Sequence, residues 1–275
     1  MKDYIQKTVF VTFISLFFIH PSVPVYASDT DTLSPEFIKN VMRIVTDTFY
    51  IKENPGGDWR GGTFWDGVMS TYDATGDQKY LDWTNQFGDA QEWKVATGNN
   101  ACRGHAILKA YIADPAEYKK APAIDKYYNR GYGISDRRFS IVDLMYMEPP
   151  VWALLGHIEK DRSYWEYLWT KVEKTIDTLF DSEENLFYRD TNWKWPKEQS
   201  KNGEKVFWSR GNGWAIGGLT EVLHYMDQSD VLYANFANLF TNLCGALVVL
   251  QQPDGFWRPS LHDPAAGNAP CPVGR

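Results

Sequence analysis

The chain has few of the residues that build disulfide frameworks, metal centres or nucleotide sites. Its 275 residues include 3 Cys and 5 His, and no CxxC, HExxH, GxSxG or phosphate-binding glycine motif occurs. An odd, sparse set of cysteines does not suit a disulfide scaffold or a zinc site. We therefore predict no metal and no cofactor.

Positive charge is also scarce, because 28 Lys and Arg stand against 35 Asp and Glu and leave a net charge of −7. No run of basic residues interrupts this balance. An acidic chain of this kind is a poor candidate for binding nucleic acid or an anionic membrane surface. We expect neither as a partner.

Long apolar runs are rare, and the clearest one is at the start. Lys2 and Lys7 precede the apolar stretch Thr8–Ile19, and the small residues of a signal-peptidase site end at Ala27. Residues 1–27 are therefore predicted to be a signal peptide, with an uncleaved anchor as the alternative. We expect export to the periplasm or beyond, and no second segment approaches the roughly 20 apolar residues of a membrane helix.

Alternating apolar and polar residues are nearly absent, whereas helical periodicity is common. This pattern predicts one all-α domain over residues 28–275, because no linker rich in Pro, Gly or Ser divides the chain. The predicted helices are Phe37–Phe49, Trp65–Thr75, Leu81–Trp93, Ala106–Ile112, Pro149–Ile158, Tyr164–Phe180, Trp214–Met226 and Tyr233–Leu250.

A faint D-x-x-Y repeat follows three apolar helices and opens the next helix each time. A short acidic residue at a helix start accepts free backbone N–H groups, and the aromatic residue can pack on the preceding helix. The spacing leaves room for one further helix pair between copies, which predicts a ring of helical hairpins. The pairs are Asp77 with Tyr80, Asp161 with Tyr164, and Asp230 with Tyr233.

Aromatic residues are abundant, with 12 Trp, 16 Tyr and 15 Phe. A large helical core explains them most simply, and a cleft that stacks on sugar rings is the alternative. Two glycine-rich segments, Gly56–Trp65 and Phe207–Trp214, are predicted to be loops on the floor of such a cleft. Arg210 can bind a carboxylate through two parallel bonds and Trp214 can stack on a sugar, or the two can form a structural cation–π pair.

Asp143 is a lone carboxylate within the apolar stretch Phe139–Met147. Burial would raise the pKa of this carboxyl and keep a proton available for catalysis. The alternative is a helix cap, in which backbone N–H groups would lower the pKa instead.

Four segments together resemble glycoside hydrolase family 105, the unsaturated rhamnogalacturonyl hydrolases, which are related to the unsaturated glucuronyl hydrolases of family 88. The resemblance covers about Trp59 to Pro264, and its most specific segment is FWSRGNGW. The segments are Asp143–Trp152 (DLMYMEPPVW), Leu186–Asp190 (LFYRD), Phe207–Trp214 (FWSRGNGW) and Gln251–Pro259 (QQPDGFWRP).

The resemblance implies a six-hairpin α/α-barrel and an oligosaccharide substrate that ends in an unsaturated uronic acid. It implies protonation at C4 of the C4=C5 double bond, addition of water at C5, and opening of the hemiketal to release the neighbouring sugar. Asp143 matches the acid and base, while Arg210 and Trp214 match residues that hold the substrate. Asn100 and Trp65 complete the expected binding site.

Three departures from the family pattern stand out. Asn99-Asn100 replaces an Asp pair that many relatives carry, and Ile141 stands where relatives often have Trp. Relatives also continue beyond Arg275, so we expect that the chain lacks the C-terminal hairpins that close the ring.

The leading hypothesis is thus a hydrolase of unsaturated rhamnogalacturonan (pectin) oligosaccharides. A catalytically weakened carbohydrate-binding remnant is favoured by Asn99-Asn100 and by the short C-terminus. A third possibility is another enzyme on the same scaffold, such as an epimerase or an unsaturated glucuronyl hydrolase of the family 88 type.

Overall fold

The computed structural model describes residues 34–53, 55–129 and 139–265. The predicted signal peptide, residues 1–27, lies outside the described residues. Cys271 and the expected truncation point near Arg275 also lie outside them.

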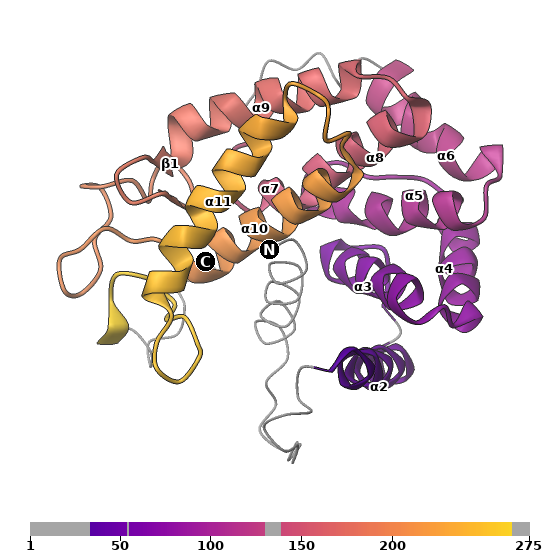
Figure 1. Cartoon of the computed structure of the whole chain (residues 1–275), viewed down its shortest axis with the longest axis horizontal. Helices are drawn as coiled ribbons and strands as arrows, with labels where there is room; N and C mark the ends of the chain where they lie inside the picture. The colour runs from indigo at the N-terminus through magenta and orange to yellow at the C-terminus, as the bar shows by residue number, and fades with distance from the viewer. Residues whose placement is uncertain (1–33, 54, 130–138, 266–275) are drawn as a thin grey trace.

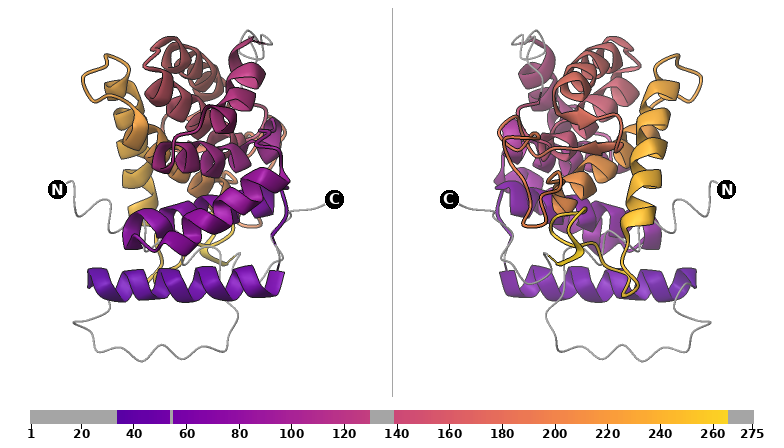
Figure 2. Two further views of the ribbon diagram at one scale, coloured as in Figure 1. Left: turned by 90° about the vertical axis from the view of Figure 1, so that its right-hand side faces the viewer. Right: turned by 90° about the vertical axis from the view of Figure 1, so that its left-hand side faces the viewer.

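The helices form two layers of a curved, ring-like arrangement (Figure 1). Successive inner helices pack against each other, each is followed by an outer helix that covers it, and α2 packs along α3 (Figure 2). The inner helices are α3 (Trp59–Thr75), α5 (Arg103–Ala113), α8 (Pro149–Glu159) and α10 (Ser209–Tyr225). The outer helices are α2 (Pro35–Glu53), α4 (Gln78–Ala90), α6 (Glu117–Ile124), α9 (Ser163–Leu179) and α11 (Tyr233–Leu250).

Short elements connect these helices. In the described ranges the only strands are β1 (Phe180–Asp181) and β2 (Leu186–Phe187), which pair antiparallel. The prediction of an all-α chain is therefore confirmed. The remaining elements are the 3₁₀-helix η1 (Gly98–Cys102), the π-helix η2 (Asp125–Asn129) and the one-turn helix α7 (Leu144–Met147).

The D-x-x-Y residues lie at the turns between inner and outer helices, as predicted. The carboxylates of Asp161 and Asp230 accept backbone N–H groups two residues later, at 2.9 and 2.8 Å. Asp77 instead accepts a bond from Arg43 at 2.8 Å. The hairpin of α5 and α6 fits between the first two copies, but only a long connection containing β1 and β2 precedes α10. The expectation of a helix pair in each interval is correct for the first interval and wrong for the second.

The apolar pattern of helix α11 determines which of its faces is buried. Phe236, Leu239, Leu243 and Leu247 recur at helical spacing and are buried against the core. By length and composition α11 is also the one helix in the described part that could cross a membrane. The expectation that no segment after the first approaches that length and apolarity therefore needs correction.

The two glycine-rich segments are largely helical, so their prediction as loops is wrong. Helix α3 begins at Trp59 because Asp58 accepts the Gly61 N–H at 3.0 Å and caps it. The glycines allow close packing: a Cβ on Gly62 would lie 2.6 Å from the Cys102 sulfur. In α10, a Cβ on Gly211 would lie 2.6 Å from Cγ1 of Val142. Glycine thus brings the starts of the inner helices together.

Most of the aromatic residues build the core, as the simpler interpretation of their number predicts. Trp152, Tyr80 and Phe207 are among the largest fully buried or nearly fully buried side chains. Trp59 and Trp195 remain 40% and 45% exposed. The exposed ring at Trp59 leaves a place for the alternative interpretation, a sugar-stacking surface.

Candidate active site

The predicted site forms where the inner helices begin. Trp59 at the start of α3 lies edge-on to Trp214 in α10, with ring centroids 6.4 Å apart. The Cys102 thiol at the end of η1 donates to the Trp59 carbonyl at 3.4 Å. Segments distant in sequence therefore meet at helix N-termini, where the backbone dipoles favour a negatively charged ligand.

Asp143 directly precedes α7 and is half-buried among apolar neighbours, including the fully buried Val142 and Met145. Its side chain does not cap the helix, and Oδ2 has no hydrogen-bond partner among the described residues. Burial raises the pKa of the Asp143 carboxyl, although a bond from its own backbone N–H and the charges of Arg210 and Arg189 oppose the rise. The structure thus favours the proton-carrying acid over the helix cap.

Arg210 lies in the first turn of α10 with its guanidinium 4.4 Å from the Trp208 ring centroid. The cation–π pair considered for this segment is thus present, with Trp208 as the partner in place of Trp214. In the described part of the chain Arg210 belongs to no ion pair, so its donors remain available to a carboxylate.

Arg189 is a second cation near Asp143, and it was not among the predicted site residues. Its carbonyl accepts the Val142 N–H at 2.9 Å, which joins the segment after β2 to the turn before α7. Its guanidinium lies 4.8 Å from the Trp193 ring centroid. The LFYRD segment contained the signal, because an arginine there follows two buried strand residues.

Trp214 is buried, and the exposed indole ring in contact with it is that of Trp59. The Trp214 ring is only 2% exposed and contacts Tyr146, whose ring centroid is 4.9 Å away. Trp59 packs against Trp214 and keeps a large exposed surface. The exposed ring face thus belongs to Trp59, which was not among the predicted site residues although it lies in the first glycine-rich segment.

Asn100 is exposed on η1, which packs against α3, α5 and α7. The buried Glu148 holds the start of η1, because it accepts the Gly98 N–H at 3.1 Å and the Lys171 ammonium at 2.9 Å. Glu148 was also passed over, although a charged residue inside the apolar stretch before a proline pair is unusual.

Trp65 lies elsewhere. Its ring is 4% exposed and stacks on Phe87 with centroids 4.6 Å apart in the main hydrophobic core. The geometry gives Trp65 a packing role and adds no support for the predicted contact with substrate. The structure therefore brings Asp143, Arg210, Trp214 and Asn100 to one end of the inner helices.

This arrangement suits proton transfer to an anionic substrate. The charges of two guanidinium groups act on a carboxyl with a raised pKa, and one of these groups belongs to no ion pair in the described ranges. An exposed indole lies at the same end of the inner helices. The cations can bind a substrate carboxylate while Asp143 supplies the proton.

Comparison with known proteins identifies the family of the chain. The sequence profile of Glycosyl Hydrolase Family 88 matches residues 31–271. An unsaturated 3S-rhamnoglycuronyl hydrolase of Formosa agariphila is 28% identical over 75% of this chain and 61% of that protein. An unsaturated rhamnogalacturonyl hydrolase of Bacillus subtilis is 25% identical over 81% of this chain and 69% of that protein. The chain thus spans less than two thirds of the first relative.

Solved structures share the fold. A family 88 glycosyl hydrolase from Bacteroides vulgatus superposes with a TM-score of 0.76 and 26% identity over 84% of this chain and 73% of that one. A family 105 glycoside hydrolase from C. acetobutylicum gives a TM-score of 0.64 and 18% identity, over 82% and 69%. These neighbours have the six-hairpin glycosidase fold, which confirms the predicted α/α class.

Proposed function

Because the chain belongs to glycosyl hydrolase family 88, we propose that it is a glycoside hydrolase for oligosaccharides that end in an unsaturated uronic acid. One observation carries this proposal beyond family membership: the buried Oδ2 of Asp143 has no hydrogen-bond partner in the described residues and lies near Arg210 and Arg189. A structural aspartate would be capped or paired, whereas a proton donor must keep an oxygen available.

The proposed reaction begins with proton transfer from Asp143 to C4 of the C4=C5 double bond. The electron pair of that bond forms the new C–H bond, and the positive charge at C5 is shared with the ring oxygen. Water adds to C5 and returns a proton to the Asp143 carboxylate. The hemiketal then opens and the neighbouring sugar leaves. Asp143 therefore acts first as acid and then as base.

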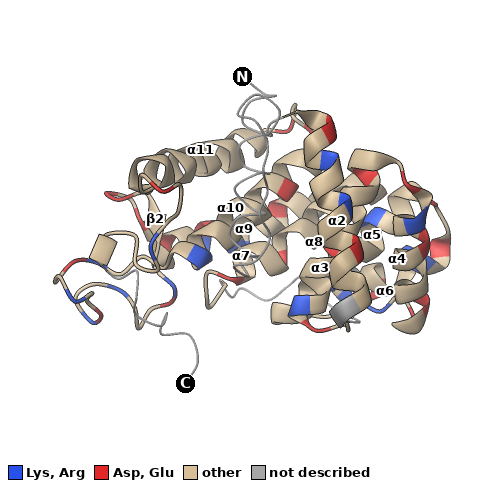
Figure 3. Cartoon of the chain, turned by 90° about the horizontal axis from the view of Figure 1, so that it is seen from below, with Lys and Arg blue, Asp and Glu red and all other residues tan. Residues whose placement is uncertain are grey.

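The other site residues would bind and orient the substrate. Arg210, held against Trp208, suits the uronate carboxylate through two parallel bonds. Trp59 offers a stacking surface supported by Trp214, and Asn100 offers hydrogen bonds from η1. Lysines and arginines are also spread along the long connection between β2 and α10 (Figure 3).

We propose a rhamnose-linked substrate, as in rhamnogalacturonan. The relatives support this choice, since the names of both hydrolases contain a rhamnose-linked uronyl unit. Two further possibilities are an aminosugar-linked substrate of the glucuronyl hydrolase type and a weakened carbohydrate-binding protein. The exposed Asn100, in place of the expected carboxylate, favours the last one.

A substrate panel with matched variants tests the proposal. The unsaturated uronide absorbs in the ultraviolet, so hydration is followed by the loss of that absorbance on rhamnose-linked and aminosugar-linked disaccharides. Asp143→Asn should lose about 10²- to 10⁴-fold in rate. Asp161→Asn, at a helix start on the outer layer, should keep full activity. Full activity of the Asp143→Asn protein would refute the assigned mechanism, and binding without turnover would favour the weakened protein.

We also propose that residues 1–27 direct export and are removed. The charged start, short apolar stretch and Ala27 support this proposal. The mass and N-terminal sequence of the protein recovered from the periplasm or medium would test it. A retained Met1 in membrane fractions would instead support an uncleaved anchor.

A further inference from the structure

Helix α7 directly follows Asp143 and is too short to fix its own position. It has four residues, and a single helical turn is unstable without outside contacts. The place of the Asp143 carboxyl therefore depends on what holds α7 against the inner helices.

One carboxylate on α3 holds two successive residues of α7. The Tyr146 hydroxyl donates to Oδ2 of Asp66 at 2.5 Å. Nδ1 of His105 lies 3.4 Å from the same oxygen, and Nε2 of that ring lies 3.1 Å from the Met147 carbonyl. Asp66 thus contacts α7 directly, through its bond from Tyr146, and indirectly, through His105.

Asp66 is itself fixed and charged. Burial works to raise the pKa of the Asp66 carboxyl, but the charge of Lys109 and the bond to His105 outweigh it, so this pKa is lowered. The Lys109 ammonium lies 2.7 Å from Asp66 and 2.8 Å from Glu221 on α10. The network therefore ties α3, α5 and α10 together around α7.

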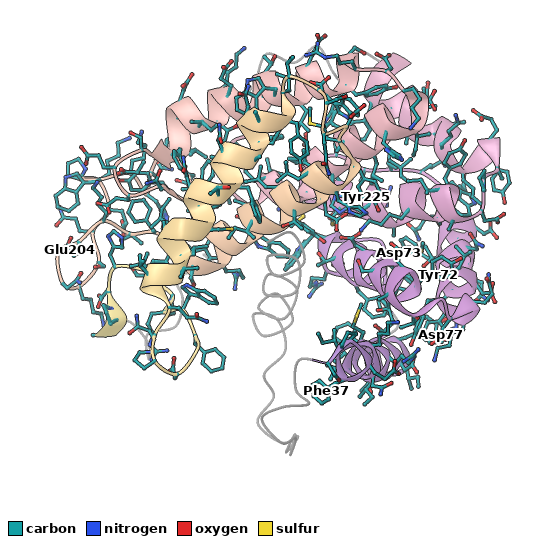
Figure 4. All side chains as sticks on the ribbon, viewed as in Figure 1. Phe37, Tyr72, Asp73, Asp77, Glu204 and Tyr225 are labelled. Atoms are coloured by element: carbon teal, nitrogen blue, oxygen red, sulfur yellow. The ribbon has the colours of Figure 1, made fainter. Side chains whose placement is uncertain are left out.

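The same network extends toward the C-terminal ends of α3 and α10. Asp73 on α3 and Tyr225 on α10 lie close together there (Figure 4), and the Lys109 ammonium is 5.9 Å from the Tyr225 ring centroid. On the other side, the Tyr146 ring lies 4.9 Å from that of Trp214. Tyr146 thus links the buried charges to the candidate active site.

We propose that Asp66, acting through Tyr146, is the positioning residue that fixes α7 and with it the Asp143 carboxyl and the Trp214 ring. The effect on catalysis rests on the proposed function, whereas the effect on α7 does not. The alternative is a purely structural network, which would contribute to stability without any specific effect on the site.

The test compares two tyrosines that each donate to a carboxylate. Tyr146→Phe removes one hydroxyl and leaves the ring against Trp214. Tyr80→Phe is the matched control, since the buried Tyr80 donates to Asp47 at 3.0 Å between outer helices. Asp66→Asn would leave Lys109 beside a neutral amide, so Tyr146→Phe is the cleaner variant.

We expect Tyr146→Phe to speed amide hydrogen exchange over residues 144–148 about tenfold and to lower kcat about tenfold, with KM changed less than about twofold. Tyr80→Phe should change neither. Unchanged exchange in α7, or a loss of kcat no greater than in Tyr80→Phe, would overturn the proposal. A wild-type protein that hydrates no unsaturated uronide would refute the proposed function. Faster exchange in α7 of its Tyr146→Phe variant would still support the role of Asp66 in fixing α7.

Discussion

The side chain of Asn212 on α10 satisfies both backbone groups of Phe187 on β2. Its Oδ1 accepts the Phe187 N–H at 2.8 Å, and its Nδ2 donates to the Phe187 carbonyl at 3.0 Å. A third bond reaches the Trp208 carbonyl at 3.0 Å. These bonds hold the strand that leads to Arg189 against the helix that carries Arg210.

Asn212→Ala should therefore lower both stability and activity. The change leaves buried backbone groups without partners, so we expect a loss of about 2–4 kcal/mol in the free energy of unfolding, measured by denaturant titration. Asn238→Ala, on the exposed face of α11, is the control and should change it by less than about 0.5 kcal/mol. Equal effects of the two substitutions would show that the link between α10 and β2 contributes nothing.

Gly211→Ala should move α10 away from the turn that carries Asp143. The added Cβ would lie 2.6 Å from Val142 and 2.7 Å from Trp208, so side chains must shift at a cost of about 1–3 kcal/mol. Gly245→Ala in α11 meets no atom within 4 Å and should be neutral or stabilising. Thermal melting and the rate on an unsaturated uronide measure both effects, and a neutral Gly211→Ala would contradict the packing argument.

The helices were largely predictable, because apolar residues recur at helical spacing where one face of a helix is buried. Helix α11 begins and ends at the predicted residues, and α3 ends at Thr75, directly before Gly76, whose φ of 70° terminates the helix. The starts of α3 and α10 were missed because glycine is normally unfavourable in helices. Here Gly62 and Gly211 permit contacts between helix starts, which only tertiary packing reveals.

The site was predictable where a residue type is rare in its surroundings. Asp143 and Arg210 were selected in this way, and the structure places both at one end of the inner helices. Trp214 was expected to expose a face, but its burial depends on contacts with Tyr146 and Trp59 from distant segments. Asp66 gave no signal in the sequence, because its importance comes from Tyr146, 80 residues away.

Arg210→Ala should weaken substrate binding more than Arg210→Lys. Lysine keeps a charge that attracts the uronate carboxylate but loses the two parallel bonds, so we expect a loss of about tenfold in affinity for Lys and more for Ala. Titration calorimetry with the substrate and the Asp143→Asn protein background measures this. If Arg210 only packed on Trp208, the Ala variant would melt at a lower temperature and bind equally well.

Asp143→Asn should stabilise the protein near neutral pH. The pKa of Asp143 is higher in the folded protein than in the unfolded chain, because burial disfavours the ionised carboxylate. The aspartate therefore destabilises the native state once the pH rises above the pKa that Asp143 has in the unfolded chain. The Tm of the variant should therefore exceed that of the wild type at pH 7, and this excess should shrink as the pH falls toward 4. Asp161→Asn keeps an oxygen that can accept the Ser163 N–H at the start of α9, and it should show no such gain. A variant that is less stable at pH 7 would contradict the raised pKa.

Asn100 is exposed on η1, at the same end of the inner helices as Asp143. If the site lacks a second carboxylate, Asn100→Asp should raise the hydration rate about tenfold or more, because a second base can help to activate water. The new charge should also raise the pKa of Asp143 further and move the high-pH limb of the rate profile upward. Asn99→Asp adds the same charge one residue away and should change the hydration rate and the pKa of Asp143 less. A wild-type protein that is already active, combined with no gain in Asn100→Asp, would show that an amide suffices at this position. The hypothesis of a weakened remnant would then lose the observation from this site that favours it.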